Sequence, residues 1–102
     1  MAVETLNPRQ RRRLSGMAQS LDCAIILGRA GATPELTARL AELLDRHELV
    51  KLRFGDFKAE RREIAEELAS QTGSALVRLI GFVAIFWKPN PDLEGREIEI
   101  EG

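Results

Sequence analysis

The chain has 102 residues, of which 44% are hydrophobic and 30% are charged, and its net charge is −1. This length fits one domain with a modest core and excludes two, and no apolar run approaches the roughly 20 residues of a membrane-spanning helix. A single cysteine, Cys23, excludes an internal disulfide and a cysteine metal cluster. The first residues lack a basic stretch followed by an apolar one, so we expect no secretory signal and a cytoplasmic location.

Charge is unevenly distributed along the chain. Residues 92–102 hold five acidic side chains against one arginine. Removing them leaves 14 Lys and Arg against 11 Asp and Glu, so residues 1–91 carry a net charge of about +3. We therefore expect a single domain over residues 1–91, followed over residues 92–102 by an acidic tail that is disordered or forms a loosely held edge strand.

Residues 6–21 are predicted to form the first helix. Leu6, Leu14 and Leu21 fall on one face at helical spacing, and Asn7 before Pro8 is typical of a helix start. Four arginines with no acid among them form the densest positive cluster in the sequence: Arg9, Arg11, Arg12 and Arg13. A solvated helix face and a surface for an anionic partner explain this cluster about equally well.

The next segment is predicted to join a strand to a second helix. Ala24–Leu27 is apolar throughout, as expected for a strand buried on both faces. Gly28-Arg29-Ala30-Gly31 turns the chain, and Thr33 followed by Pro34 is predicted to begin a helix. The glycine backbone, the helix N-terminus and the Arg29 charge together favour phosphate binding. Taken alone, the loop is explained more simply as a tight turn.

The second helix is expected to run from Thr33 to about His47, and a strand over Leu49–Phe54 follows it. Because His47 lies within the leucine stripe of this helix, we expect a packed residue at the helix end rather than a catalyst or ligand. In the strand, Lys51 and Arg53 alternate with apolar residues and form a basic outer face.

A third helix is predicted over Lys58–Thr72, closed by Gly73. Its glutamates form an outer stripe that is most simply a solvated face, and its first turn is crowded by three cations, Lys58, Arg61 and Arg62. Two apolar runs, Ala75–Ile80 and Val83–Trp87, are predicted to form a β-hairpin. We expect Trp87 to be a core or edge-strand aromatic rather than a residue that stacks on a base.

The predicted order is therefore helix-β-α-β-α-β-β. Strands that alternate with helices imply parallel pairing with right-handed crossovers, and the final hairpin adds an antiparallel strand. The expected fold class is α/β in the two-layer α+β sense, with a mixed four-stranded sheet packed against helices.

Several segments, in this order, resemble the CRM domain (chloroplast RNA splicing and ribosome maturation) in its free-standing bacterial YhbY-like form. They are residues 6–14 with the Gln-Arg-Arg-Arg run, Ile26–Thr33, His47–Leu52, Ala65–Leu68 with Thr72-Gly73, and Ile80-Gly81 with Phe86–Pro89. The family usually has a lysine at the position of Arg29, an aliphatic residue at that of Ala32, and Tyr-Arg-Pro where this chain has Trp87-Lys88-Pro89. The acidic tail is not a family feature.

The resemblance implies a fold similar to the C-terminal domain of translation initiation factor three. It also implies RNA binding and association with precursors of the large ribosomal subunit. The family's Gly-x-x-Gly loop is similar to the loop by which KH domains hold an RNA backbone, and it corresponds here to Gly28, Arg29, Ala30 and Gly31. Around it we expect a positive field from Arg9, Arg12, Arg13, Lys51, Arg53, Lys58, Arg62 and Lys88.

The function expected from the sequence is thus non-catalytic binding of ribosomal RNA during assembly of the large subunit. The alternative is a protein–protein adaptor whose acidic helix face and tail recruit a basic ribosomal protein. An enzyme is not expected, because the loop lacks the Gly-Lys-Ser/Thr ending of a nucleotide-binding P-loop and no nucleophile–base pair is evident. We expect RNA as the partner, no metal, cofactor, small-molecule substrate or membrane, and a monomer.

Overall fold

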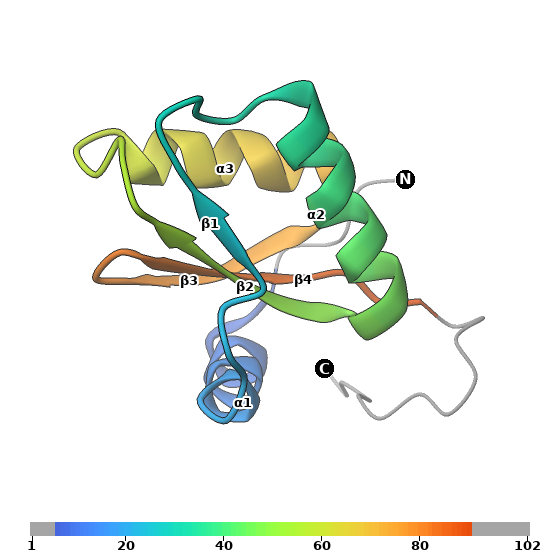
Figure 1. The fold of residues 1–102 in the computed structure, drawn as a ribbon. Helices are drawn as coiled ribbons and strands as arrows, with labels where there is room; N and C mark the ends of the chain where they lie inside the picture. The colour runs from blue at the N-terminus through green and yellow to red at the C-terminus, as the bar shows by residue number, and fades with distance from the viewer. Residues whose placement is uncertain (1–5, 91–102) are drawn as a thin grey trace.

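The helices and strands follow one another in the predicted order. The structure is a computed structural model, and it describes residues 6–90. Its elements are α1 (Pro8–Ala18), β1 (Ile25–Leu27), α2 (Pro34–His47), β2 (Leu49–Phe54), α3 (Arg61–Thr72), β3 (Ala75–Ile80) and β4 (Val83–Trp87) (Figure 1). The strands form a 4-stranded sheet of order β1-β2-β4-β3. Because β1 is parallel to β2 while β4 is antiparallel to both β2 and β3, the predicted mixed sheet is confirmed.

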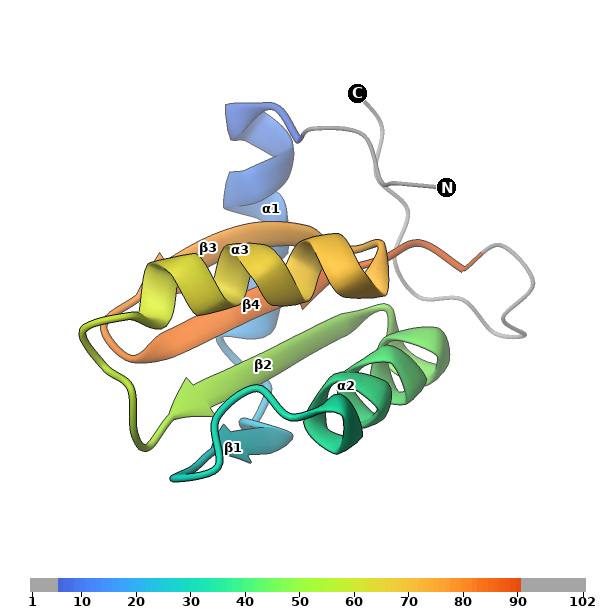
Figure 2. The same ribbon diagram turned by 90° about the horizontal axis from the view of Figure 1, so that it is seen from above.

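Helices cover both faces of the sheet. α2 and α3 pack on one face over a core that includes Leu40, Phe54 and Phe86 (Figure 1). α1 crosses the opposite face, where Leu14 packs in a second cluster with Trp87 (Figure 2). The predicted two-layer arrangement therefore gains a partial third layer, because the apolar stripe of α1 is buried against the face that the other helices leave open.

Three predicted helix caps are present. The Asn7 side chain accepts a hydrogen bond from the Gln10 amide at 2.8 Å, and the Gln10 side chain accepts one from the Asn7 amide at 3.0 Å. At the start of α2, Thr33 Oγ1 accepts a hydrogen bond from the Leu36 amide at 3.1 Å. Gly73 ends α3 with φ 69°, a left-handed conformation that favours glycine.

Two helix boundaries differ from the prediction. α1 ends at Ala18 instead of continuing to residue 21, and Leu21 lies exposed in the connection that follows. α3 begins at Arg61 instead of Lys58, because residues 59–60 form a turn in which the Glu60 amide donates to the Phe57 carbonyl at 3.1 Å, and Phe57 itself has φ 55°. A left-handed residue cannot belong to a right-handed helix, so the segment before Arg61 is a structured loop.

Two burial predictions were wrong. Ile26 in β1 is 62% exposed, because β1 is an edge strand and α1 packs on β2, β3 and β4. His47 is exposed as the last residue of α2, and the buried residue at this helix end is Glu48, only 1% exposed. Glu48 turns the chain with φ 62°, and its side chain accepts a hydrogen bond from the Asn90 amide at 2.9 Å. The expectation that Trp87 belongs to the core is confirmed.

None of the described helices combines the length and the apolar character needed to cross a bilayer. The predicted tail over residues 92–102 lies outside the described residues, so its alternatives stay predictions.

Candidate nucleic-acid interface

The Gly28–Gly31 loop is an exposed turn between β1 and α2. The Gly31 amide donates to the Gly28 carbonyl at 3.0 Å, and the Thr33 amide donates to the Gly31 carbonyl at 3.0 Å. Arg29 and Ala30 lie exposed at the tip. Within the described residues, the amides of Arg29, Ala30 and Ala32 donate to no protein acceptor. They are therefore available to an anion beside the N-terminus of α2.

The two glycines of this loop differ in what the structure requires of them. Gly31 has φ +75°, and a Cβ built there would lie 3.3 Å from Cε2 of Phe57, so a side chain would be both strained and crowded. Gly28 has no such φ, and a Cβ built there meets nothing within 4 Å. The fold therefore needs a glycine at position 31, whereas the bare backbone at Gly28 leaves room for a ligand.

Two further connections lie at the same end of the sheet as this loop (Figure 1). Phe57, in the connection between β2 and α3, packs on Gly31. The residues on either side of this connection bind the β3–β4 turn: Arg61 Nε donates to the Gly81 carbonyl at 2.9 Å, and the Phe54 amide donates to the Phe82 carbonyl at 2.7 Å. The β2–α3 connection thus links the glycine loop to the β3–β4 turn, and the three connections form one surface.

An aromatic ring flanked by cations lies on this surface. The Phe82 ring, 45% exposed, lies 4.7 Å from Lys58 Nζ and 5.2 Å from Arg61 Cζ, measured to the ring centroid. Lys58 was a predicted site residue, whereas Phe82 and the supporting role of Arg61 were missed. A large aromatic residue in a two-residue hairpin turn, Gly81-Phe82, is the feature of the sequence that could have identified this group.

The arginines of α1 divide into two kinds. Arg9, Arg12 and Arg13 are exposed, as expected of a surface for an anion. Arg11 is half-buried, and its Nη1 donates to the Leu76 carbonyl at 2.6 Å and to the Val77 carbonyl at 2.7 Å. These carbonyls lie where the register of β3 against β4 shifts, between Leu76 and Arg78. The hydrogen bonds of Arg11 therefore hold α1 against the sheet.

The other predicted cations lie at both ends of the molecule. Lys51 and Arg53 project from β2 on the side of α1, and Lys51 Nζ donates to the Leu21 carbonyl at 2.9 Å. Arg62, in the first turn of α3, is exposed. Lys88 follows β4 at the opposite end of the sheet from the glycine loop, 3.9 Å from a carboxylate oxygen of Asp45. The structure therefore does not bring Lys88 together with the loop.

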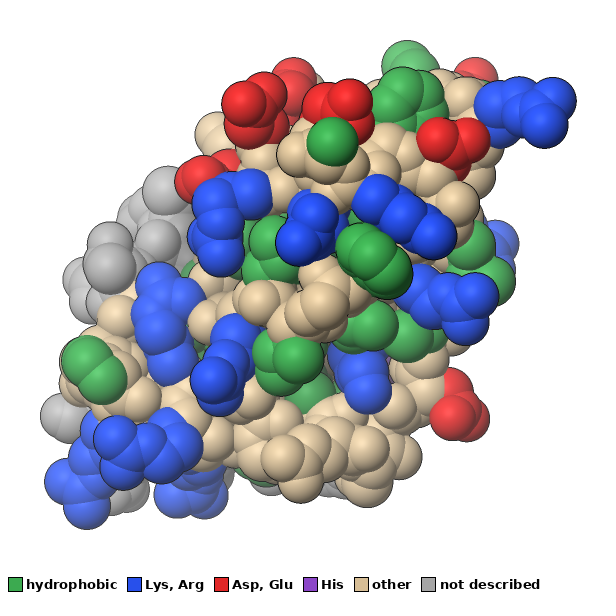
Figure 3. Space-filling view, turned by 90° about the vertical axis from the view of Figure 1, so that its left-hand side faces the viewer, with side chains coloured by type: hydrophobic (Ala, Val, Ile, Leu, Met, Phe, Trp, Pro, Cys, Tyr) green, Lys and Arg blue, Asp and Glu red, His purple; other side chains and the backbone are tan. Residues whose placement is uncertain are grey.

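The face of the protein at the β3–β4 turn is rich in positive charge. Figure 3 shows Lys and Arg side chains spread across the face at the β3–β4 turn, with hydrophobic side chains between them and most Asp and Glu side chains at the upper rim. No carboxylate forms an ion pair with Arg29, Arg53, Lys58 or an α1 arginine within the described part of the chain. No described ion pair therefore neutralises Arg29 or these neighbouring cations.

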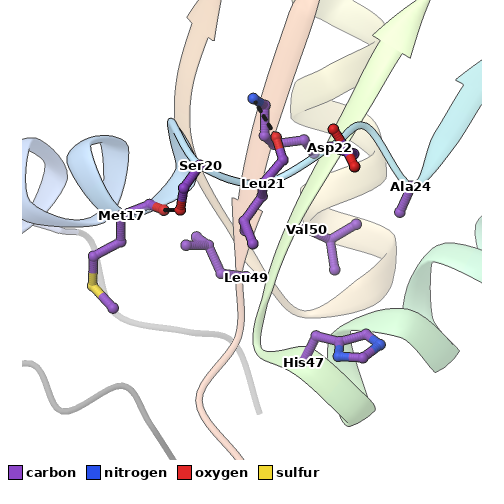
Figure 4. A pocket seen from close by; sticks show the side chains of 9 residues that line it. Met17, Ser20, Leu21, Asp22, Ala24, His47, Leu49 and Val50 are labelled. Atoms are coloured by element: carbon purple, nitrogen blue, oxygen red, sulfur yellow. Dashed lines mark hydrogen bonds between the residues drawn. The ribbon is translucent and has the colours of Figure 1, made fainter.

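A pocket of about 520 Å³ lies elsewhere, between the end of α1, the end of α2 and the start of β2 (Figure 4). Its lining is mainly apolar, including Met17, Leu21 and Leu49, with His47 at one side. No group of three or more His, Cys, Asp and Glu side chains that could hold a metal ion occurs among residues 6–90.

The fold and the loop define a small α+β domain with an exposed glycine turn beside a basic surface. The chain belongs to the CRS1/YhbY (CRM) domain family, whose model matches residues 6–88. It is 28% identical over 91 residues to an RNA-binding protein of Haemophilus influenzae, covering 88% of this chain and 92% of that protein. It is 30% identical over 87 residues to the probable RNA-binding protein PA4753 of Pseudomonas aeruginosa, covering 84% of each.

A solved structure has the same architecture. It is the solution structure of the hypothetical protein SAV1595 from Staphylococcus aureus, described as a candidate RNA-binding protein. It superposes with a TM-score of 0.77 at 27% sequence identity, covering 95% of this chain and all of that one. The predicted family and the predicted fold class are therefore both confirmed.

Proposed function

We propose that this protein is a non-catalytic RNA-binding protein that holds the backbone of ribosomal RNA at the Gly28–Gly31 loop during assembly of the large ribosomal subunit. The observation that carries the proposal is the set of unpartnered amides at the exposed tip of this loop, next to the N-terminus of α2. Its relatives from Haemophilus influenzae and Pseudomonas aeruginosa, which are named as RNA-binding proteins, support RNA as the ligand.

The proposed contact is to phosphate rather than to a base. The amides of Arg29, Ala30 and Ala32 and the positive end of the α2 dipole stabilise an anion, and the Arg29 guanidinium adds a charge-assisted hydrogen bond. Lys58, Arg62 and the exposed α1 arginines raise the local concentration of a polyanion. The buried Trp87 takes no part, because its ring lies in the cluster under α1.

The experiment compares loop variants with a variant of equal charge change elsewhere. Gly28→Ala adds a methyl group where the fold has room, so a loss of RNA affinity reports the ligand and not the fold. Arg29→Glu reverses the charge at the loop tip. The control, Arg46→Glu, makes the same charge change near the far end of α2, about 20 Å from Thr33 at 1.5 Å per residue.

We expect Gly28→Ala and Arg29→Glu each to weaken binding to structured ribosomal RNA about tenfold or more, because a charge-assisted contact contributes roughly 1.5–3 kcal/mol. Arg46→Glu should bind within about twofold of the wild type once long-range charge is screened by salt. Equal affinities for the wild type and both loop variants in a filter-binding assay would show that the loop does not hold RNA.

The ribosomal partner is tested in cell extract. Crosslinking the protein to RNA and sequencing the recovered fragments should return segments of large-subunit ribosomal RNA from immature particles. If deletion of residues 92–102 instead abolishes recovery of a basic ribosomal protein while affinity for naked RNA is unchanged, the adaptor function is the correct one.

A further inference from the structure

The sheet face that carries α1 is only partly covered. Across this face the paired residues form three rows, and the first, Leu49–Trp87–Ala75, lies under α1. In the second row, Ile85 is flanked by two cations, Lys51 and Arg78. The third row, nearest the β3–β4 turn, crosses all four strands: Ile26, Arg53, Val83 and Ile80.

The third row exposes aliphatic side chains to solvent. Ile26 is 62% exposed and Ile80 is 50% exposed, and neither is covered by α1. Single exposed apolar residues are ordinary, but a row of them next to an exposed aromatic ring is typical of a binding surface. Phe82 follows Ile80 by two residues, in the turn at the end of the row, and its ring lies against Lys58 and Arg61 at the start of α3.

The positive charge of this face suits a polyanionic ligand. None of the four strands contains an acidic residue, whereas Lys51, Arg53 and Arg78 all project among the apolar side chains. The guanidinium groups of Arg53 and Arg78 form no hydrogen bond or ion pair with any described residue. A protein partner would have to supply acidic side chains at this spacing, while a nucleic-acid backbone supplies a phosphate at every residue.

The alternation of apolar and cationic side chains favours unpaired nucleotides. In a duplex the base faces are stacked inside and only phosphates and groove edges are presented, so aliphatic side chains gain little. A single strand presents its base faces as well as its phosphates. The base faces can contact Ile26, Val83 and Ile80, and the phosphates can contact the neighbouring arginines.

The row is continuous with the glycine loop. Ile26 lies two residues before Gly28, and its Cγ2 is the atom nearest to a Cβ built at Gly55, at 3.2 Å. From β1 to β3 the row spans three strand spacings, about 14 Å. An RNA strand held by its backbone at the loop can therefore continue across the strands toward Phe82.

We propose that the exposed row Ile26–Arg53–Val83–Ile80, with Arg78, binds a single-stranded RNA segment adjoining the segment held at the glycine loop, and so makes the protein prefer unpaired RNA. The proposal rests on the proposed function. The test uses one mixed-sequence oligoribonucleotide, either single-stranded or annealed to its complement, with fluorescence anisotropy as the readout.

The double variant Ile26→Ser with Ile80→Ser removes the exposed aliphatic groups. It should weaken single-strand binding about fivefold, the lower end of the loss for one stacked base, while duplex binding changes less than about twofold. Leu21→Ser is the matched control, since Leu21 is an exposed aliphatic residue outside the row. Arg78→Gln should reduce the salt dependence of single-strand binding by a slope of about 0.7, with no change for the duplex. Thermal melting confirms that each variant is folded.

Equal wild-type affinity for the two RNAs, or equal losses for both in the double variant, would overturn the inference. So would a wild-type dimer in sedimentation that the double variant converts to monomer, because the row would then be a self-association surface. A different result would contradict the proposed function itself: the variant Arg29→Glu would bind both RNAs as tightly as the wild type does.

Discussion

Replacing Arg11 with methionine separates the structural arginine of α1 from the exposed ones. The change keeps an unbranched stem that can pack beside Leu14 but removes the Nη1 donor that bonds the carbonyls of Leu76 and Val77. We expect the free energy of unfolding to fall and the affinity for RNA to stay within about twofold, because this guanidinium faces the sheet.

The size of the loss follows from the two bonds. A hydrogen bond to a charged group contributes about 1.5–3 kcal/mol to stability. Because the site is only part-buried, water can hydrogen-bond to the two carbonyls in the variant and offset part of this loss. A net loss of about 2 kcal/mol is therefore expected, which lowers Tm by roughly 8–16 °C for a domain of this size.

The assay is urea denaturation followed by the fluorescence of Trp87, the only tryptophan in the chain, which is buried in the cluster that α1 covers. Arg12→Met is the control, since Arg12 is exposed, and it should change stability by less than about 0.5 kcal/mol. In RNA binding the order should reverse, with Arg12→Met the weaker binder. Equal stability of the two variants would refute the assignment of Arg11 as the residue that fastens α1.

Three further outcomes are expected. Phe54→Ala should destabilise the fold by about 3–5 kcal/mol in the same denaturation assay, because its ring is fully buried between the sheet and the helices; a loss below about 1 kcal/mol would contradict this packing. Gly31→Ala should lower the free energy of unfolding by about 1–2 kcal/mol, because of the left-handed φ at this position and the contact with Phe57. Gly28→Ala should change it by less than about 0.5 kcal/mol. Thermal melts in which Gly28→Ala is the less stable variant would contradict the loop geometry. Trp87 emission should be characteristic of a buried indole and should not change when RNA is added, and strong quenching by RNA would contradict its burial.

The sequence predicted the elements that depend on local chemistry. Asn7, Thr33 and Gly73 were identified as helix ends because their side chains or backbone conformations satisfy the ends of a helix directly. The alternation of Val50, Lys51 and their neighbours likewise fixed which side of β2 faces the core. These features need no knowledge of distant contacts.

What the sequence could not predict depends on tertiary placement. An apolar β1 is compatible with burial on both faces, and only the place where α1 crosses the sheet leaves Ile26 exposed. Helical periodicity assigned His47 to the core, but the left-handed turn at Glu48 places the next residue there instead. Helical spacing places Arg11 beside the apolar stripe and Arg12 away from it, but it could not identify the partners of Arg11, which are carbonyls 65 and 66 residues away.

For the candidate site, the residue types of the loop were predictable and their surroundings were not. Gly28 to Gly31 stood out by composition alone, yet the contact between Gly31 and Phe57 joins two connections that are far apart in the sequence. The same holds for Phe82, whose neighbours Lys58 and Arg61 belong to another element.

The position of β4 between β2 and β3 has a consequence for synthesis of the chain. Among the strands in residues 6–90, β4 is the last to be synthesised, yet it is the neighbour of both β2 and β3. A nascent chain that ends before Val83 therefore leaves β3 without its partner in this sheet and β2 with one edge open. The sheet therefore cannot be completed until the final hairpin has emerged. We expect any shortening that removes β4 to yield an aggregation-prone chain in place of a smaller domain.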